Sequence, residues 1–531
     1  MTPVPDHEIA IIGGGPGGIA AAAKLTEAGL TDFVIIDRAA DFGGSWHENT
    51  YPGLGVDVPA ITYQYSFARN PDWSRVFPKG AEVKKYHVEV AKRFGLYEHA
   101  RFDTDIVTEH WDESASLWRL ATATGDEITA RYVISAVGAF VNPKLDPGIP
   151  GLADFRGKIQ RAPSWDHGYD HTGKRVAIIG TGASSVQITP TIAPEVAALS
   201  VFQRTPVWVL PKPDFRIPAP ARRVLRTPGL QAAVNGVALM GMDVVLRVLS
   251  GAPPSTVEPV LRQMDQVSLK FIRRYLKWVV KDPVTRAALT PDFGPIAKRP
   301  TFSNAYLRAY NRANVDLITA PIETFTADGI RTRDGVEHTF DMIVLATGYE
   351  VFSDPETYRE GMVTGREGFD LGKFYTENGL QAYEGVAIPK LPNRWMLVGP
   401  YCWTGSGWHA FVEMTADHAV RAIREAHRRK AVRMEVRQDV HDAYHGEVIT
   451  RSAALRYYFT DLNKHVATYY RNSQGDSTYL RPSGFFAARR AHRTFPFTDY
   501  TFETAATASP ARAATNGRAK RKPSPELVTE G

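Results

Sequence analysis

The sequence predicts an α/β fold with two units of the same design, each made of a strand, a glycine-rich turn, a helix and a second strand. In the first unit the apolar run Ile9 to Ile12 leads into GGGPGG and a helix-like stretch. In the second unit RVAIIGTGASS repeats this pattern from Arg175 onward. The order is typical of Rossmann-like dinucleotide-binding domains, in which the glycine turn and the helix N-terminus receive a pyrophosphate.

The first unit carries the residues expected of a flavin dinucleotide site. Gly13, Gly15 and Gly18 occupy the three positions of GxGxxG. They serve a tight turn, close approach of the backbone to the pyrophosphate, and close packing of the helix on the strand. The next strand ends at Asp37, 19 residues after Gly18, where a carboxylate accepts hydrogen bonds from ribose hydroxyls. We therefore expect FAD at this site.

The second unit differs at the matched position. Gly180, Gly182 and Ser185 fill the glycine positions, and Arg204, followed by Thr205, lies 19 residues after Ser185. A planar guanidinium suits a phosphate, whereas a carboxylate suits a free hydroxyl. This contrast predicts NADPH rather than NADH at the second site. The alternative is that Arg204 is a surface arginine paired with a local acid.

A third apolar segment, Met342 to Ala346, precedes Thr347 and Gly348 and parallels VISAVG after the first unit. We expect a strand of the FAD domain here, with Gly348 beside the flavin. The NADP domain is then an insertion in the FAD domain. The predicted divisions are 1–140 and 339–503 for the FAD domain, 141–210 and 296–338 for the NADP domain, 211–295 for a helical insertion, and 504–531 for a disordered tail.

The insertion has helical apolar spacing on both sides of GAPPS at 251–255. Leu239, Met242 and Leu246 share one helical face, which either lines a substrate entrance or packs in the core. Asp243 and Arg247 interrupt the roughly 18 uncharged residues that a membrane span needs. No transmembrane span is predicted, and a peripheral membrane contact remains compatible with this segment.

Composition excludes several classes of protein. One cysteine, Cys402, in 531 residues rules out a disulfide, the paired thiols of disulfide reductases and a multi-cysteine metal site, and no metal is expected. The net charge is +6, and the tail holds +3 of it, so nucleic-acid binding has no support from the body of the chain. Asp6 and Glu8 stand where a secretory signal has Lys or Arg, so a cytoplasmic location is expected.

Several linked segments together resemble the type I Baeyer-Villiger monooxygenases, a class of FAD- and NADPH-dependent flavoproteins. They are GGSW at 43–46, YPGLGVDVPAITYQYSF at 51–67, FRGKIQRAPSWD at 155–166, the second glycine motif with FQRTP, and KRPTFSNAY at 298–306. The family fingerprint is FxGxxxHxxxW followed by Pro or Asp. Phe155, Gly157, Trp165 and Asp166 fit this pattern, but Arg161 stands at the histidine position, which predicts altered domain coupling or substrate scope. His167 lies nearby as a candidate substitute.

The resemblance assigns roles to residues that are not distinctive by themselves. It implies that Arg299 is the catalytic arginine and that Asp57 orients it. It further implies that Gly44, Trp46, Asp57 and Tyr63 line the flavin site, and that Lys298 joins Arg204 at the NADPH phosphate. Without the resemblance, each of these would read as a core residue, a turn cap or a surface charge.

The implied activity is oxygen insertion into a ketone. NADPH would reduce FAD, dioxygen would form a flavin peroxide, and attack on a ketone would give an ester or lactone, with Arg299 as the fixed cation. A small hydrophobic ketone is the expected substrate. Two alternatives stay open: a monooxygenase acting on sulfides or amines, for which dependence on Arg299 is weaker, and an uncoupled NADPH-oxidising flavoprotein.

Overall fold

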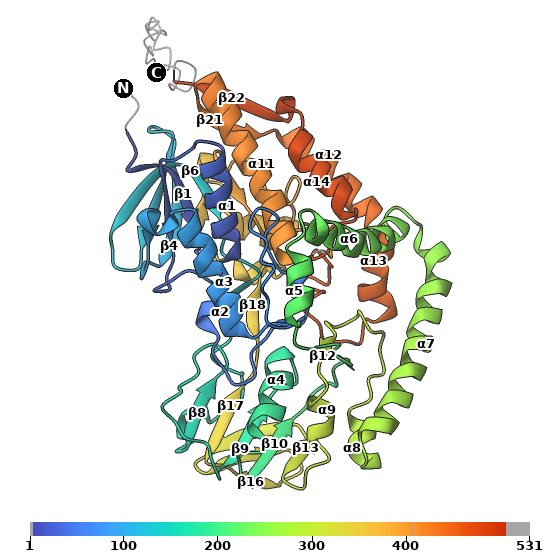
Figure 1. Cartoon of the computed structure of the whole chain (residues 1–531). Coiled ribbons are helices and arrows are strands. Elements are labelled where there is room, and N and C mark those ends of the chain that lie inside the picture. The colour runs from blue at the N-terminus through green and yellow to red at the C-terminus, as the bar shows by residue number, and fades with distance from the viewer. Residues whose placement is uncertain (1–3, 406, 506–531) are drawn as a thin grey trace, which may run out of the picture.

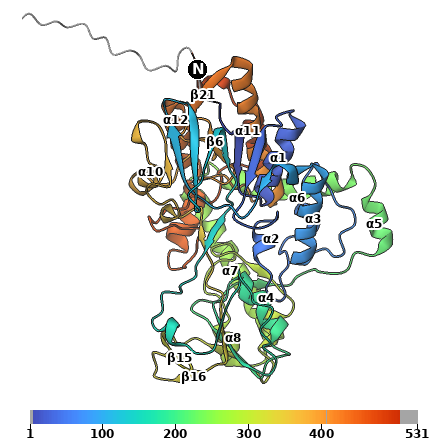
Figure 2. The ribbon, with the colours of Figure 1, turned by 90° about the vertical axis from the view of Figure 1, so that its left-hand side faces the viewer.

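The computed structural model describes residues 4–405 and 407–505 and has two lobes, each built on a sheet. The upper lobe in Figure 1 contains the N-terminal strand β1, and the lower lobe contains β9 and its neighbours. Figure 2 shows the same two lobes after a quarter turn, with a narrow junction between them. The predicted tail lies largely outside the described residues, which end at 505.

The sheet of the first lobe has the strand order β19-β4-β5-β6-β1-β2-β3, and β20 also pairs with β6. β1 is central and runs parallel to both β2 and β6. The strand β4 pairs antiparallel with β5, and β5 with β6, forming a wing on one side. The bounds are β1 His7–Ile12, β2 Phe33–Ile36, β3 Ala100–Arg101, β4 Ile106–Asp112, β5 Leu117–Thr122, β6 Glu127–Ser135, β19 Val363–Thr364 and β20 Arg394–Met396.

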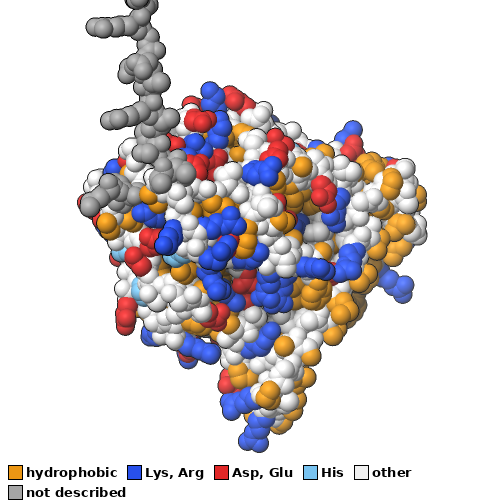
Figure 3. Space-filling model, turned by 90° about the horizontal axis from the view of Figure 1, so that it is seen from above, with side chains coloured by type: hydrophobic (Ala, Val, Ile, Leu, Met, Phe, Trp, Pro, Cys, Tyr) orange, Lys and Arg blue, Asp and Glu red, His pale blue; other side chains and the backbone are white. Residues whose placement is uncertain are grey.

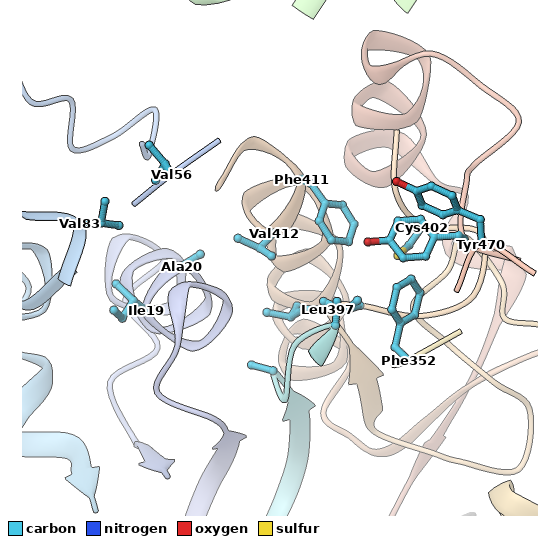
Figure 4. Close-up of a cluster of buried hydrophobic side chains, with 14 of the residues drawn as sticks. Ile19, Ala20, Val56, Val83, Phe352, Leu397, Cys402, Phe411, Val412 and Tyr470 are labelled. Carbon is cyan, nitrogen blue, oxygen red and sulfur yellow. The ribbon is translucent and has the colours of Figure 1, made fainter. Parts of the chain in front are cut away.

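Helices α1 (Pro16–Glu27) and α11 (Trp408–Arg429) pack against each other beside this sheet. Figure 4 shows Ile19 and Ala20 of α1, and Phe411 and Val412 of α11, in one buried hydrophobic cluster with Leu397. Apart from Ile19, alanine and glycine fill α1 from Gly17 to Ala23, so the helix approaches its neighbours closely. Cys402 lies in the same cluster, and burial raises the pKa of its thiol, so this thiol is not a reactive group.

The second lobe has a five-stranded parallel sheet in the order β13-β10-β9-β17-β8. Continuous apolar runs such as β9 and β17 fit a sheet that is covered on both faces. A small antiparallel sheet of β14, β15 and β16 lies beside it. The bounds are β8 Lys158–Arg161, β9 Arg175–Ile179, β10 Ala198–Phe202, β13 Val315–Ile318, β14 Ile322–Thr326, β15 Gly329–Thr332, β16 Glu337–Thr339 and β17 Met342–Leu345.

The position of β17 corrects one predicted boundary. We placed the return to the FAD domain at residue 339, which would put Met342–Leu345 in that domain. In the structure β17 pairs with β9 and β8 of the second lobe. A short buried apolar strand fits either parallel sheet, so its composition did not decide between them.

Two antiparallel linkers join the lobes. β7 (Phe140–Pro143) carries the chain out of the first lobe, and β18 (Tyr349–Val351) brings it back, and the two pair with each other. The second lobe is therefore inserted in the first, as the sequence predicts. Because both crossings are paired strands, they form a single two-stranded linker.

The helical insertion follows β11 (Val209–Leu210), which pairs with β12 (Thr301–Phe302) on its far side. It forms α5 Ala219–Leu225, α6 Leu230–Leu249, α7 Pro254–Val279 and α8 Pro283–Ala288. The break at GAPPS separates α6 from α7 as expected. The other helices are α2 Ser45–Glu48, α3 Gly80–Arg93, α4 Ala183–Ile192, α9 Tyr306–Ala309, α10 Leu371–Asn378, α12 Gln438–Arg451, α13 Ala453–Tyr457 and α14 Phe485–Thr494, and β21 Ala431–Val436 pairs with β22 Tyr500–Thr504.

Candidate active site

A cavity of about 1960 Å³ lies between the lobes and reaches both glycine-rich turns. Its lining includes Gly13 and Gly15 from the first turn and Gly180 and Gly182 from the second, together with Arg299. A single cavity thus meets the two helix N-termini that the sequence assigned to two dinucleotides. This arrangement places two anion-binding turns on opposite sides of one space.

The first turn is shaped by contacts that only glycine permits. Gly13 has φ +111°, and a Cβ there would lie 2.6 Å from the Ala136 carbonyl oxygen. A Cβ on Gly18 would lie 1.8 Å from the Gly13 carbonyl oxygen, so Gly18 allows α1 to pack on the turn. Gly18 does not line the cavity. Gly18 therefore serves to set the position of α1 against the turn.

Asp37 directly follows β2 and lines the cavity. Its Oδ2 accepts a hydrogen bond from the Gly14 backbone N–H, and its Oδ1 accepts one from the Ala39 N–H at 2.7 Å. Burial raises the pKa of this carboxyl, and the two backbone donors oppose that shift. The Asp37 carboxylate therefore also stabilises the glycine turn through its hydrogen bond with Gly14.

The second turn repeats this geometry. Gly180 has φ +111°, and a Cβ there would lie 2.6 Å from the Ala346 carbonyl oxygen. A Cβ on Gly182 would have no neighbour within 4 Å, although Gly182 lines the cavity. Ser185 is fully buried and does not line the cavity. As at Gly18, the third position of the motif serves packing.

Two cations lie together at the far end of the second site. Arg204 is exposed and lines the cavity with Thr205 and Lys298. Burial lowers the pKa of Lys298, and the nearby charge of Arg204 lowers it further. Among the described residues, no carboxylate lies within 4 Å of Arg204, so the alternative of a local ion pair is wrong. Two adjacent unpaired cations suit a phosphate.

Arg299 and Asp57 meet at the cavity wall. The Arg299 Nη2 donates a hydrogen bond of 2.6 Å to Asp57 Oδ2. The Asp57 charge raises the pKa of the Arg299 guanidinium, and burial opposes this. The tyrosines that also face Arg299 are Tyr469, Tyr470 and Tyr479.

The segment that carries Asp57 belongs to the first lobe and is held by residues of the second lobe and of the start of the helical insertion. Gln187 of α4 donates from Nε2 to the Gly55 carbonyl oxygen at 2.9 Å and accepts from the Tyr51 hydroxyl at 3.2 Å. Lys212 Nζ donates to the Val56 carbonyl oxygen at 2.7 Å. These contacts hold the Asp57 backbone against the second lobe, so the geometry of the ion pair depends on how the lobes sit together.

An aromatic wall follows the Gly44 turn. Trp46 Nε1 donates to the Tyr63 hydroxyl at 2.9 Å, and both side chains line the cavity. The Tyr63 ring meets the edge of His409 at a centroid distance of 4.6 Å. His409 and His87 are fully buried with their Nε2 atoms 2.8 Å apart. Burial lowers the pKa of His87 to about 3 and lowers that of His409 as well, so both rings are neutral at pH 7.

Some of these residues have no signal in the sequence. The tyrosines at 469, 470 and 479 and the pair of His87 with His409 come from segments that carry no recognisable motif. His409 directly follows the GSGW segment, but its partner is 322 positions away. Only the fold brings these side chains to the cavity wall.

The remaining predicted residues lie at the linkers and the entrance. Gly348, with φ +88°, lines the cavity between β17 and β18, at the start of the returning linker strand. Arg161, at the fingerprint histidine position, also lines the cavity. His167 Nε2 lies 2.9 Å from Thr50 Oγ1 of the first lobe. Leu239 of α6 lines the cavity, Leu246 is buried outside that lining, and the Met242 side chain is outside the described residues.

Comparisons with known proteins agree with this geometry. The family model described as "Pyridine nucleotide-disulphide oxidoreductase" matches residues 10–220, which hold both glycine turns. A Baeyer-Villiger monooxygenase of Pseudomonas aeruginosa is 36% identical over 441 residues, covering 82% of this chain and 81% of that protein. One of Streptomyces coelicolor is 37% identical, covering 76% of this chain and 75% of that protein.

Solved structures give the same result for the fold. Cyclohexanone monooxygenase from Rhodococcus sp. Phi1, bound to NADP⁺, has a TM-score of 0.80 at 26% identity, covering 94% of this chain and 99% of that one. OTEMO in complex with FAD and NADP has a TM-score of 0.81 at 23% identity, covering 94% and 100%. The single cysteine excludes the disulfide chemistry in the name of the matching family model. Because it is 36% and 37% identical to the two relatives over most of its length, the chain belongs to the Baeyer-Villiger monooxygenases.

Proposed function

We propose that the cavity between the lobes is the active site at which this monooxygenase inserts an oxygen atom into a small apolar ketone. The observation that carries the proposal is the Arg299–Asp57 pair on the wall of a cavity that also meets both glycine turns. The overall reaction converts a ketone, O₂, NADPH and H⁺ into an ester or lactone, NADP⁺ and H₂O. One oxygen atom enters the product, and NADPH supplies the electrons that reduce the other to water.

The first turn fits FAD. Gly13 and Gly15 leave room for a pyrophosphate at the N-terminus of α1, and the Asp37 carboxylate lies where ribose hydroxyls donate. A Cβ on Gly44 would lie 2.9 Å from the Gly15 Cα, so two glycines from different segments form one cradle. Trp46 and Tyr63 would flank the flavin end of the molecule.

The second turn fits NADPH. Gly180 and Gly182 leave the backbone of the turn open at the N-terminus of α4. Arg204 and Lys298 would hold the 2′-phosphate, which NADH lacks, and Thr205 lines the same cavity. Relief of the repulsion between the two cations by an added phosphate favours NADPH over NADH.

Bound FAD, reduced by NADPH, supplies the transfer of oxygen from O₂. The role of Arg299 is to hold a fixed positive charge where negative charge develops on oxygen during attack on the ketone carbonyl. Asp57 positions the guanidinium and keeps it protonated. Tyr469, Tyr470 and Tyr479 line the same cavity, and their electrostatic interaction with Arg299 also raises the pKa of its guanidinium.

The cavity lining includes the apolar side chains of Ala238 and Leu239 of α6 and the aromatic rings of Trp403 and Trp408. Such a wall accepts hydrocarbon and offers few polar partners, so we propose a small hydrophobic ketone as the substrate.

The test is a product panel with purified FAD-loaded protein. We expect cyclic and linear apolar ketones to give esters or lactones with NADPH, and much slower turnover with NADH. The sulfide- or amine-oxidising alternative predicts sulfoxides or N-oxides and no ester. NADPH consumption with hydrogen peroxide as the only product would contradict both oxygenase assignments.

A further inference from the structure

Helix α6 has polar side chains on its buried face and large apolar side chains on its solvent-exposed face. Gln231, Asn235 and Asp243 are 7%, 8% and 3% exposed. Gln231 Oε1 accepts a hydrogen bond from Gln64 at 2.8 Å, and Asp243 Oδ1 accepts one from the Phe486 N–H at 3.0 Å. The opposite face carries six large apolar side chains with exposed fractions between 42% and 70%: Val234, Val237, Met240, Val244, Val245 and Val248.

Helix α7 continues this exposed apolar character. Val260, Val267, Phe271 and Trp278 are spaced by seven, four and seven residues, which places them on one line along the helix. Their exposed fractions run from 53% to 76%. The opposite face, including Leu261 and Leu276, packs into the core. Figure 1 shows α6 leading across to α7, which forms the right-hand edge of the molecule, and in Figure 3 hydrophobic side chains gather on that side.

Unpaired cations accompany the apolar line of α7. Residues 211–295 hold 13 Lys and Arg against 6 Asp and Glu, a net charge of +7 in a chain whose total is +6. Two of the acids, Asp243 and Asp265, are buried. Among the described residues, no carboxylate lies within 4 Å of the exposed side chains of Lys270, Arg274, Lys277 and Lys281.

We propose that α6 and α7 form a docking surface for a lipid membrane with anionic headgroups, the exposed apolar residues named above entering the interface and the cations of α7 meeting the headgroups. A helix with one exposed apolar face lies in the plane of such an interface. By length and composition α6 is also apolar enough to cross a membrane, and only 24% of its most apolar window is buried. The polar contacts of its inner face keep it on the protein, so it lies on the membrane and does not cross it.

A second copy of the chain fits this surface less well. In a two-fold symmetric contact the same patch meets itself, so the cations of α7 would face one another. Anionic headgroups instead supply the opposite charge, each nearby Lys or Arg strengthening binding about fivefold. The positive charge of the docking surface therefore favours an anionic membrane over a second copy of the chain as the partner.

The docking surface shares a helix with the cavity. Ala238 and Leu239 line the cavity from α6, whose other face carries Val237 and Val248. Docking would bring this cavity wall close to the lipid phase, in which apolar ketones concentrate. This consequence rests on the proposed substrate class, whereas membrane binding itself does not.

Co-sedimentation of the FAD-loaded protein with vesicles tests the docking. Vesicles of phosphatidylcholine with phosphatidylglycerol are compared with pure phosphatidylcholine. We expect binding to the anionic vesicles, weakening by salt, and about a fivefold loss of partitioning in Lys277→Gln. The double variant Val237→Glu/Val248→Glu and the independent variant Phe271→Ser/Trp278→Ser should both lose binding. The matched control Val336→Glu, 47% exposed in the second lobe, should bind like the wild type.

Ketone turnover in vesicle-free buffer separates this inference from the proposed function. Both double variants should keep FAD and turn over a soluble ketone normally, which also shows that they fold. The inference is overturned if the wild type stays in the supernatant, or if Val336→Glu loses binding equally. It is also overturned if light scattering shows a dimer that Val237→Glu/Val248→Glu dissociates while vesicles are not bound, because a second copy then covers the surface.

Discussion

The Arg299 guanidinium and the Asp57 carboxylate, 242 residues apart in the chain, are joined by a 2.6 Å hydrogen bond at the junction of the two lobes. Asp57 comes from a loop of the first lobe that is tethered to α4 of the second through Gln187. Arg299 follows the helical insertion. The geometry of this ion pair therefore depends on how three parts of the chain are placed: the loop of the first lobe, α4 of the second lobe, and the segment after the helical insertion.

Asp57→Asn tests the positioning role of the carboxylate. The variant keeps the shape of the side chain and removes the charge that holds Arg299. A hydrogen bond between charged groups contributes about 1.5–3 kcal/mol, so ester formation should slow by about tenfold or more. Flavin reduction by NADPH, followed by stopped-flow absorbance, should not change.

The matched control is Asp72→Asn, which breaks the exposed ion pair with Arg226. Exposed pairs contribute about 0–1 kcal/mol, so this variant should behave like the wild type. Equal ester formation in Asp57→Asn and the wild type would refute the positioning role.

Arg204→Ala tests the phosphate site. Loss of a cation that contacts only the 2′-phosphate should lower the NADPH-to-NADH preference in flavin reduction by about 10- to 100-fold, through weaker NADPH binding. Lys174→Ala, an exposed cation of the same lobe outside the cavity lining, is the control. An unchanged preference in Arg204→Ala would remove Arg204 from the site.

Two glycines of the second turn should respond differently to alanine. In Gly180→Ala the new Cβ meets the Ala346 backbone at a φ that strains any side chain, so the melting temperature should fall. In Gly182→Ala nothing lies within 4 Å of the new Cβ, so the melting temperature should hold while KM for NADPH rises. A normal KM in Gly182→Ala would mean that no pyrophosphate approaches this position.

Buried neutral histidines should make the protein sensitive to acid. His87, His409, His418 and His492 are fully exposed to solvent in an unfolded chain and fully buried here, and burial lowers the pKa of each. Below about pH 6.5 these histidines bind protons in the unfolded state but stay unprotonated in the folded state. The stability present above pH 6.5 is therefore lost as pH falls toward about 3, the pKa to which burial lowers His87.

Each such histidine contributes up to about 1.4 kcal/mol per pH unit. The melting temperature should fall steeply below pH 6.5, and the fall should be smaller in His409→Asn than in the wild type. His110→Gln, at an exposed position, should keep the wild-type profile. A wild-type melting temperature that is flat between pH 6.5 and 5 would contradict neutral burial.

The sequence predicts the parts of the fold that local pattern encodes. Glycine spacing and strand ends located both turns, Asp37 and Arg204, and all four line the cavity between the lobes. The same patterns could not separate contact from packing, since Gly18 and Ser185 stand in the motif but outside the cavity lining. The motif position fixes the backbone, and the tertiary neighbours decide what the side chain meets.

Long-range placement was not predictable in this way. The strand Met342–Leu345 has the same composition as strands of either lobe, and only its pairing with β9 places it in the second. Likewise, His87 meets His409, and Tyr470 lines the same cavity as Arg299, although these residues come from distant segments of the chain. Each isolated residue resembles an ordinary core residue, so its place at the site follows from the fold alone.

The central claim is that the fixed charge of Arg299 directs oxygen into a ketone. The direct measurement is the amount of ester formed per NADPH consumed by Arg299→Ala and by the wild type, with hydrogen peroxide assayed in parallel. The loss of one such stabilising donor costs about 10²–10³ in rate, so the variant should still consume NADPH but release hydrogen peroxide with almost no ester. An ester-to-NADPH ratio equal to that of the wild type would contradict the claim.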